Sequence, residues 1–195
     1  MPVEHRWAGL DRRTIGPAAG VLVLALLFAV VLPAVDGAVS QEREVTAGTV
    51  LGVGQDVTFV PAVGWNIDSG LPAKAAHGLP SALVAKVTTG GTSIEVRTVT
   101  WDDDLDALLG RVNELHEDES DPGWHVSGPR HSVTTTDGVT GIGEEFVAPS
   151  GPGRIVAFLQ DDVGVEVVVT STHAELGQHR SAIDDMVAST SFGDD

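Results

Sequence analysis

The chain has 195 residues and a formal net charge of −17, from 28 acidic and 11 basic side chains. Residues 36–195 alone carry 26 acidic against 8 basic side chains, and this charge argues against binding to nucleic acid or to anionic lipid surfaces. The absence of cysteine excludes disulfides, a thiol nucleophile and attachment of lipid through an N-terminal cysteine.

An uncharged apolar segment, residues 14–35, follows the N-terminal residues 1–13. At about 1.5 Å per residue, a helix of this length is roughly 33 Å long and matches a hydrocarbon core of about 30 Å. Three arginines precede the segment and the next basic residue is Arg43, so the positive-inside rule places residues 1–13 in the cytoplasm. We therefore expect a single-pass protein of the cell membrane with an extracytoplasmic domain.

A cleavable signal peptide is the alternative interpretation of this segment. Ala38–Ser40 is a weak cleavage site before Gln41, and both interpretations export the domain. The apolar run is longer than the roughly 7–15 residues of a signal core, which favours an uncleaved anchor.

The residues after the anchor have the size of one domain. We expect a stalk over residues 36–54, with a possible first strand near Glu44–Val53, and a domain over residues 55–195. Asp56–Trp65 alternates apolar and polar residues before a proline and a glycine, which predicts a strand that enters a turn. Asn66–Ser81 is rich in Gly, Pro, Ser and Asn and is expected to be a loop.

The middle of the domain combines a hairpin with a helix. Ala82–Trp101 contains two β-prone runs joined at Gly90–Gly91, which predicts a hairpin. The spacing of apolar residues then changes to that of an amphipathic helix, which Thr100 or Asp102 can cap. Its apolar face consists of Leu105, Leu108, Leu109, Val112 and Leu115.

The C-terminal part is predicted to contain four strands and one helix. Turn signals separate the strands Trp124–Thr135, Val139–Val147, Arg154–Gln160 and Gly164–Thr172. Thr172 and Glu175 then form a capping box for a single helix. Its inner face consists of Leu176, His179, Ile183, Met186, Val187 and Thr190. Because short turns join antiparallel strands, the fold class is α+β: one antiparallel-sheet sandwich with two packing helices.

Several motifs resemble the Mog1/PsbP-like sandwich. They are FVPAVGW (59–65), WDDDLDALL (101–109), FVAPSGPGRIVAFLQDDVGVEVVVT (146–170) and the closing helix, and the similarity covers roughly residues 46–192. Actinobacterial envelope proteins with this sandwich include the LpqN-type lipoproteins and the trehalose monomycolate transport factor. The resemblance implies a role in binding or assembly at the cell envelope, without catalytic residues.

The motifs for catalysis or metal binding are incomplete. The acidic run that begins at Asp102 lacks the glycine and the glutamate of a calcium-binding loop at positions six and twelve. His125 and His131 do not have the fixed spacing of metal ligands, although with nearby carboxylates they provide an alternative, a metal-assisted hydrolase of the envelope. We expect no catalytic, cofactor-binding or metal-binding residue and no cofactor.

Three tryptophans, Trp65, Trp101 and Trp124, are the candidate ligand-binding residues. Each borders a strand, a turn or a helix start, where a large ring can close the edge of a core. If two of them face one open groove, they form an apolar or sugar-stacking site. The expected function is a non-enzymatic binding or accessory module in envelope assembly or transport, acting through a protein partner or an apolar ligand. A structural domain without a ligand is the further alternative.

Overall fold

The structure is a computed structural model that describes residues 43–54, 56–76, 83–119 and 123–193. Within these ranges, no helix has the length and hydropathy required to cross a bilayer. The expected anchor at residues 14–35 and the stalk up to residue 42 lie outside the described residues.

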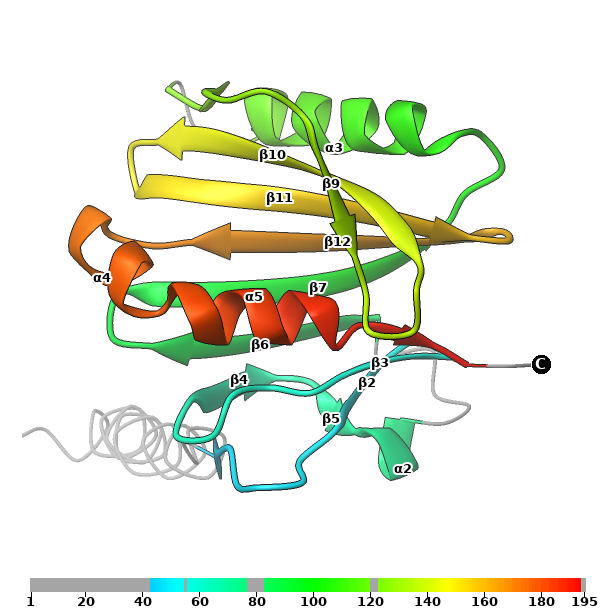
Figure 1. The fold of residues 1–195 in the computed structure, drawn as a ribbon, viewed down its shortest axis with the longest axis vertical. Helices are drawn as coiled ribbons and strands as arrows, with labels where there is room; N and C mark the ends of the chain where they lie inside the picture. The colour runs from blue at the N-terminus through cyan, green and yellow to red at the C-terminus, as the bar shows by residue number, and fades with distance from the viewer. Residues whose placement is uncertain (1–42, 55, 77–82, 120–122, 194–195) are drawn as a thin grey trace, which may run out of the picture. The chain divides into compact units, whose positions relative to one another are not determined.

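A nine-stranded antiparallel sheet forms the centre of the described chain (Figure 1). Its strands are β1 (Arg43–Glu44), β4 (Asn66–Ser69), β6 (Val84–Thr89), β7 (Thr92–Thr100), β8 (His125–Val126), β9 (His131–Thr134), β10 (Thr140–Ala148), β11 (Gly151–Gln160) and β12 (Val163–Thr170). They lie in the order β1-β4-β6-β7-β12-β11-β10-β8, with β9 also paired to β10. The predicted α+β class with an antiparallel sheet is confirmed.

Two-residue turns join the long neighbouring strands. The strand residues that pair across these turns are Thr89 with Thr92, Ala148 with Gly151, and Gln160 with Val163. The predicted turn at Gly90–Gly91 and the turn predicted after Gln160 are therefore confirmed. Strand β12 pairs with β7 along its whole length, which joins the two hairpins into one sheet.

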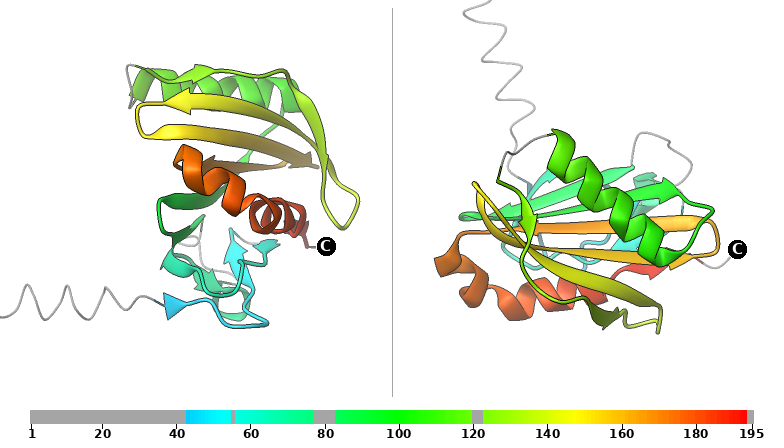
Figure 2. Two further views of the ribbon diagram at one scale, coloured as in Figure 1. Left: turned by 60° about the vertical axis from the view of Figure 1, so that its left-hand side comes forward. Right: turned by 90° about the horizontal axis from the view of Figure 1, so that it is seen from above.

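Helices and a smaller sheet cover the two faces of the large sheet (Figure 2). The covering elements are β2 (Leu51–Val53), β3 (Val57–Phe59), β5 (Leu71–Pro72), α2 (Ala73–Ala76), α3 (Leu105–Glu119), α4 (His173–Gln178), α5 (Arg180–Ala188) and β13 (Ser191–Phe192). The small sheet has the strand order β13-β3-β2-β5. It covers one face of the large sheet together with α5, while α3 covers the opposite face. Residues 43–53 therefore belong to the folded domain through β1 and β2.

The large sheet separates two hydrophobic cores. Successive side chains of a strand point to opposite faces, so Val156 and Phe158 of β11 face α5 and the small sheet, whereas Ile155 and Ala157 face α3. All four residues are at most 1% exposed. Helix α3 contributes the buried Leu108, Leu109 and Val112 to the second core, and the partly buried Leu105 packs against it, so four members of the predicted apolar face take part.

Helix α3 begins with a side-chain cap from Asp104. Its carboxylate accepts the Ala107 N–H at 2.7 Å, so neither Thr100 nor Asp102 supplies the cap. Asp104 directly precedes the first helical residue, where a cap stabilises the helix most effectively because the N–H groups of the first turn have no helical partner. The position of the helix itself agrees with the prediction.

Polar contacts also attach α3 to the sheet. Glu144 of β10 is only 5% exposed, and it accepts hydrogen bonds from Asn113 Nδ2 of α3, at 2.7 Å, and from Arg130 Nε. Arg130 also pairs with Asp106 of α3. The hydrogen bond to Glu144 raises the pKa of the Arg130 guanidinium, so a permanent cation compensates the buried carboxylate.

The prediction of a loop over Asn66–Ser81 is wrong for residues 66–76, which form β4, β5 and α2. Strand β4 pairs with both β1 and β6, and β5 pairs with β2. The composition of this segment favours turns, but pairing with neighbouring strands overrides the local preference. Conversely, the strand expected over Asp56–Trp65 is confined to β3.

Two further expected elements are interrupted. The strand Trp124–Thr135 divides into β8 and β9, because Pro129 has no N–H to donate to a ladder and Gly128 precedes it. The closing helix divides at His179 into α4 and α5, two residues after Gly177. Thr172 accepts the Glu175 N–H at 3.4 Å, as a capping box requires, but the Glu175 carboxylate accepts the Gly91 N–H of the β6–β7 turn.

We predict opposite effects of adding a methyl group at two glycines. In Gly153→Ala the new Cβ would lie 2.1 Å from Phe146 Cζ and 2.3 Å from the Val169 carbonyl oxygen. This clash should lower the free energy of unfolding by about 2 kcal/mol or more. Urea unfolding of the full chain in mild detergent, followed by circular dichroism, measures the change.

Gly110→Ala is the matched control. Gly110 is inside α3 and its added Cβ would meet no atom within 4 Å, so the free energy of unfolding should rise by about 0.5–1 kcal/mol. A Gly153→Ala variant as stable as the parent would contradict the tight packing of Phe146 on β11.

Candidate functional site

The structure places the three candidate tryptophans in two separate cores. Trp65 is 4% exposed in the first core, where its ring meets the His179 ring edge-on with centroids 5.7 Å apart. Trp101 and Trp124 are half-buried and pack against the second core. The three rings therefore do not line one groove, and Trp65 closes the core beside the α4–α5 break.

Trp124 is held in a stack of three rings. Its centroid lies 4.6 Å from that of His116 and 3.6 Å from that of Phe146, with interplanar angles of 16° and 24°. His116 Nε2 is in turn 3.1 Å from Glu166 Oε1. Because both faces of the Trp124 ring are occupied, the ring offers no open face on which a sugar could stack.

A hollow of about 210 Å³ adjoins this stack on the α3 face of the sheet. Trp124 and His116 form one side, and Lys86 and Glu95 lie on the strands opposite. The hydroxyl groups of Ser93 and Thr170 in its floor bond to each other at 2.6 Å. These two hydroxyl groups are thus already paired, whereas Trp124 Nε1 has no hydrogen-bond partner among the described residues.

The two histidines of the hydrolase alternative lie apart. His125 pairs with Val147 and His131 with Gly143, so four residues of β10, about 13 Å, separate them. The His125 ring bonds through Nδ1 to the Gly123 carbonyl at 3.0 Å, whereas the His131 ring lies against Gly143, so the two rings contact different parts of the chain. In the described part of the chain, no three His, Asp or Glu side chains form a group able to hold a metal.

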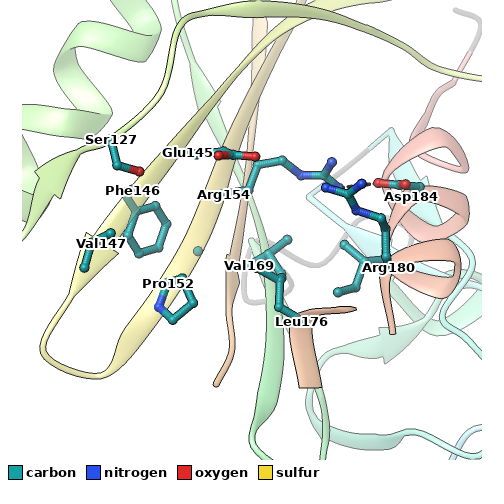
Figure 3. A pocket seen from close by; sticks show the side chains of 12 residues that line it. Ser127, Glu145, Phe146, Val147, Pro152, Arg154, Val169, Leu176, Arg180 and Asp184 are labelled. Carbon is teal, nitrogen blue, oxygen red and sulfur yellow. Dashed lines mark ion pairs between the residues drawn. The ribbon is translucent and has the colours of Figure 1, made fainter. Parts of the chain in front are cut away.

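A groove on the other face of the sheet has a different character (Figure 3). This groove, called the α5 groove below, has a volume of about 260 Å³ and lies between strands β10–β12 and helices α4–α5. Its helical wall comes from both sides of the break at His179, with Leu176 from α4 and Ile183 from α5. The apolar residues of its lining include Val147, Pro152, Val169, Leu176 and Ile183.

Charged side chains border the α5 groove. Arg154 of β11 pairs with Asp184 of α5 through Nη2 and Oδ1, 2.8 Å apart. Arg180 lies one helical turn before Asp184, on the same side of α5, and its side chain has no ion pair within the described ranges. Glu145, opposite Arg154 on β10, is exposed. The arrangement suits binding, because guanidinium groups remain charged and do not transfer protons at neutral pH.

A larger hollow of about 490 Å³ lies near Asp56 and Leu83. Both residues adjoin parts of the chain that the structure does not describe, so its extent is undefined. The α5 groove is lined entirely by described residues, and it is the candidate functional site.

The sequence contains one signal for this site, and it is not a motif. Basic residues are rare after residue 36, so Arg154 and Arg180 are two of only eight. Arg180 precedes Asp184 by four positions, which places both on one face of the closing helix. The approach of Arg154 to this helix depends on sheet packing, for which the sequence has no local signal.

Comparisons with solved structures identify the fold. No family model and no curated protein matches the chain. Among solved structures, the cyanobacterial PsbP protein (CyanoP) from Synechocystis sp. PCC 6803 is 11% identical, with a TM-score of 0.51 over 76% of this chain and 95% of that chain. The chain has a Mog1/PsbP-like fold.

Two further structures have lower TM-scores. The Ran-binding protein Mog1p from Saccharomyces cerevisiae is 13% identical, with a TM-score of 0.43 over 71% of this chain and 91% of that chain. The protein PA94 of unknown function from Pseudomonas aeruginosa is 14% identical, with a TM-score of 0.44 over 64% and 94%. At such identities the likeness concerns the fold alone, so the function must be argued from the site.

Truncation of Trp124 tests whether the ring is part of the core. Trp124→Ala should lower the free energy of unfolding by about 3 kcal/mol, because the ring is stacked on the buried Phe146. Trp124→Phe keeps an aromatic ring in the stack and should cost less than half as much. Urea unfolding of both variants measures the difference, and an unchanged stability of Trp124→Ala would show that the ring is free for a ligand.

Proposed function

We propose that the protein is a non-enzymatic binding module held at the outer face of the cell membrane by residues 14–35. The observation that carries the binding role is the α5 groove, an open groove with an apolar floor and charged groups at its border. Concave apolar sites with a few convergent polar groups are typical of ligand binding. The apolar length of residues 14–35 and the arginines before them support the anchor and its orientation.

The proposed setting is envelope assembly or transport in an actinobacterium. The motif resemblance to the LpqN-type lipoproteins and the trehalose monomycolate transport factor supports this setting, and the large negative charge is compatible with an exported domain that does not bind nucleic acid. An anchor raises the local concentration of the domain near other membrane components, so weak binding in the groove is sufficient.

Single cysteines test the topology, since the chain itself has none. Ser150→Cys places a thiol in the exposed β10–β11 turn, and Glu4→Cys places one before the expected anchor. A membrane-impermeant maleimide should label Ser150→Cys in intact spheroplasts and Glu4→Cys only after lysis. The reverse pattern would place the domain in the cytoplasm and overturn the proposal.

Photo-crosslinking in living cells tests the binding role. A benzoylphenylalanine at Leu176, in the α5 groove, should give a specific adduct that mass spectrometry detects. Benzoylphenylalanine in place of Arg111, whose side chain is 53% exposed on α3, is the control and should give no specific adduct. Identical adducts at both positions, or none at either, would contradict a binding site in the groove.

A further inference from the structure

The border of the α5 groove is a local exception to the acidity of the domain. Residues 36–195 carry 26 acidic and 8 basic side chains, yet two arginines, Arg154 and Arg180, border this one groove. At physiological ionic strength, charges are screened beyond about 8 Å, so a ligand in the groove responds mainly to these nearby groups. The four charged side chains of the lining, Arg154, Arg180, Asp184 and Glu145, sum to zero, and Arg180 is the cation that the Arg154–Asp184 pair leaves over at the α5 end.

The two arginines have different roles. The Arg154 side chain is 22% exposed and its guanidinium is held by Asp184 at 2.8 Å, so it is fixed in place. Arg180 has no such partner in the described part of the chain, although it extends toward the same end of the groove (Figure 3). A guanidinium presents five N–H donors, so Arg180 has donors available for an anionic group.

The floor beside these arginines is apolar. Val147, Pro152 and Leu176 are partly exposed to solvent and line the groove together with the buried Val169 and Ile183. Covering such surface stabilises a complex by roughly 25 cal/mol per Å² of apolar area. The groove volume, about 260 Å³, is slightly below the range of roughly 300–1,000 Å³ typical of drug-sized ligands. The groove therefore fits a short apolar chain better than a bulky ligand.

We propose that the α5 groove binds a small amphiphilic anion, with its acidic group on Arg180 and its aliphatic chain on the apolar floor. The concave floor favours such a molecule over a flat protein surface, and the anchored position near a membrane supplies amphiphiles. This inference rests on the proposed function, whose ligand class it specifies. The shared chemistry is one carboxylate or phosphate group on an aliphatic chain.

The test uses the full chain in phosphatidylcholine nanodiscs, with empty nanodiscs as background. Saturation-transfer NMR measures binding of octanoate, octyl phosphate and uncharged octanol. Both anions should bind more tightly than octanol, and their ratio distinguishes a carboxylate from a phosphate ligand. Arg180→Gln should weaken octanoate binding about tenfold, the effect expected for one charge-assisted hydrogen bond. Arg180→Lys keeps the positive charge and should retain part of the octanoate affinity.

Two variants serve as controls. Arg111→Gln removes an exposed guanidinium from α3 and should leave octanoate binding unchanged, while Leu176→Ser should weaken the binding of all three probes. Circular dichroism confirms that each variant is folded, which is expected because Arg180 is exposed.

Three results would overturn the inference. They are equal affinity of the parent for octanoate and octanol, an undiminished affinity in Arg180→Gln, and tighter binding of a peptide with a C-terminal leucine carboxylate than of octanoate. Since the assay uses purified protein, such a result leaves the topology and the crosslink at position 176 untouched. A reversed labelling pattern would instead overturn the proposed function and leave the ligand chemistry intact.

Discussion

Strand β11 imposes the main constraint on this fold, because it is buried on both of its faces. Four successive residues, Ile155 to Phe158, are at most 1% exposed, and each neighbouring pair points in opposite directions. A strand of this kind is stable only if separate layers cover each side of the sheet. Helix α3 covers one side, and the small sheet with α5 covers the other. The hydrogen bond from Asn113 of α3 to Glu144, together with Arg130, which pairs with both Glu144 and Asp106 of α3, orients the helix on the sheet.

The α5 groove follows from incomplete cover on the second side. Helix α5 packs through Ile183, Met186 and Val187, but α4 turns away at His179 and contributes no fully buried residue. The ends of β10 and β11 therefore keep apolar side chains in contact with solvent, next to Arg154. The Glu175 carboxylate holds the displaced α4 on the β6–β7 turn through the Gly91 N–H. The groove is thus fixed at one end by a hydrogen bond between distant parts of the chain.

Much of this fold could be predicted from the sequence because its signals are local. The Gly90–Gly91 turn, the apolar face of α3 and the β-branched residues of β12 each specify their own element. Strand β4 could not be predicted, since Asn66–Ser69 becomes a strand only through its neighbours β1 and β6. The candidate site was missed for a similar reason. The tryptophans stood out by size but close the cores, whereas Arg154 and Asp184 meet only after the sheet and α5 have packed.

The pairing of β13 with β3 has a consequence for biogenesis. Ser191 lies beside Thr58 and Phe192 beside Val57, so the last described strand completes a sheet that begins near the start of the domain. Because a polypeptide is synthesised from its N-terminus, β3 is made well before β13. The small sheet is therefore incomplete until residues 191–192 have been made, and its apolar side chains need protection during that interval. A bulky tag fused directly after Phe192 would hinder the pairing of β13 with β3.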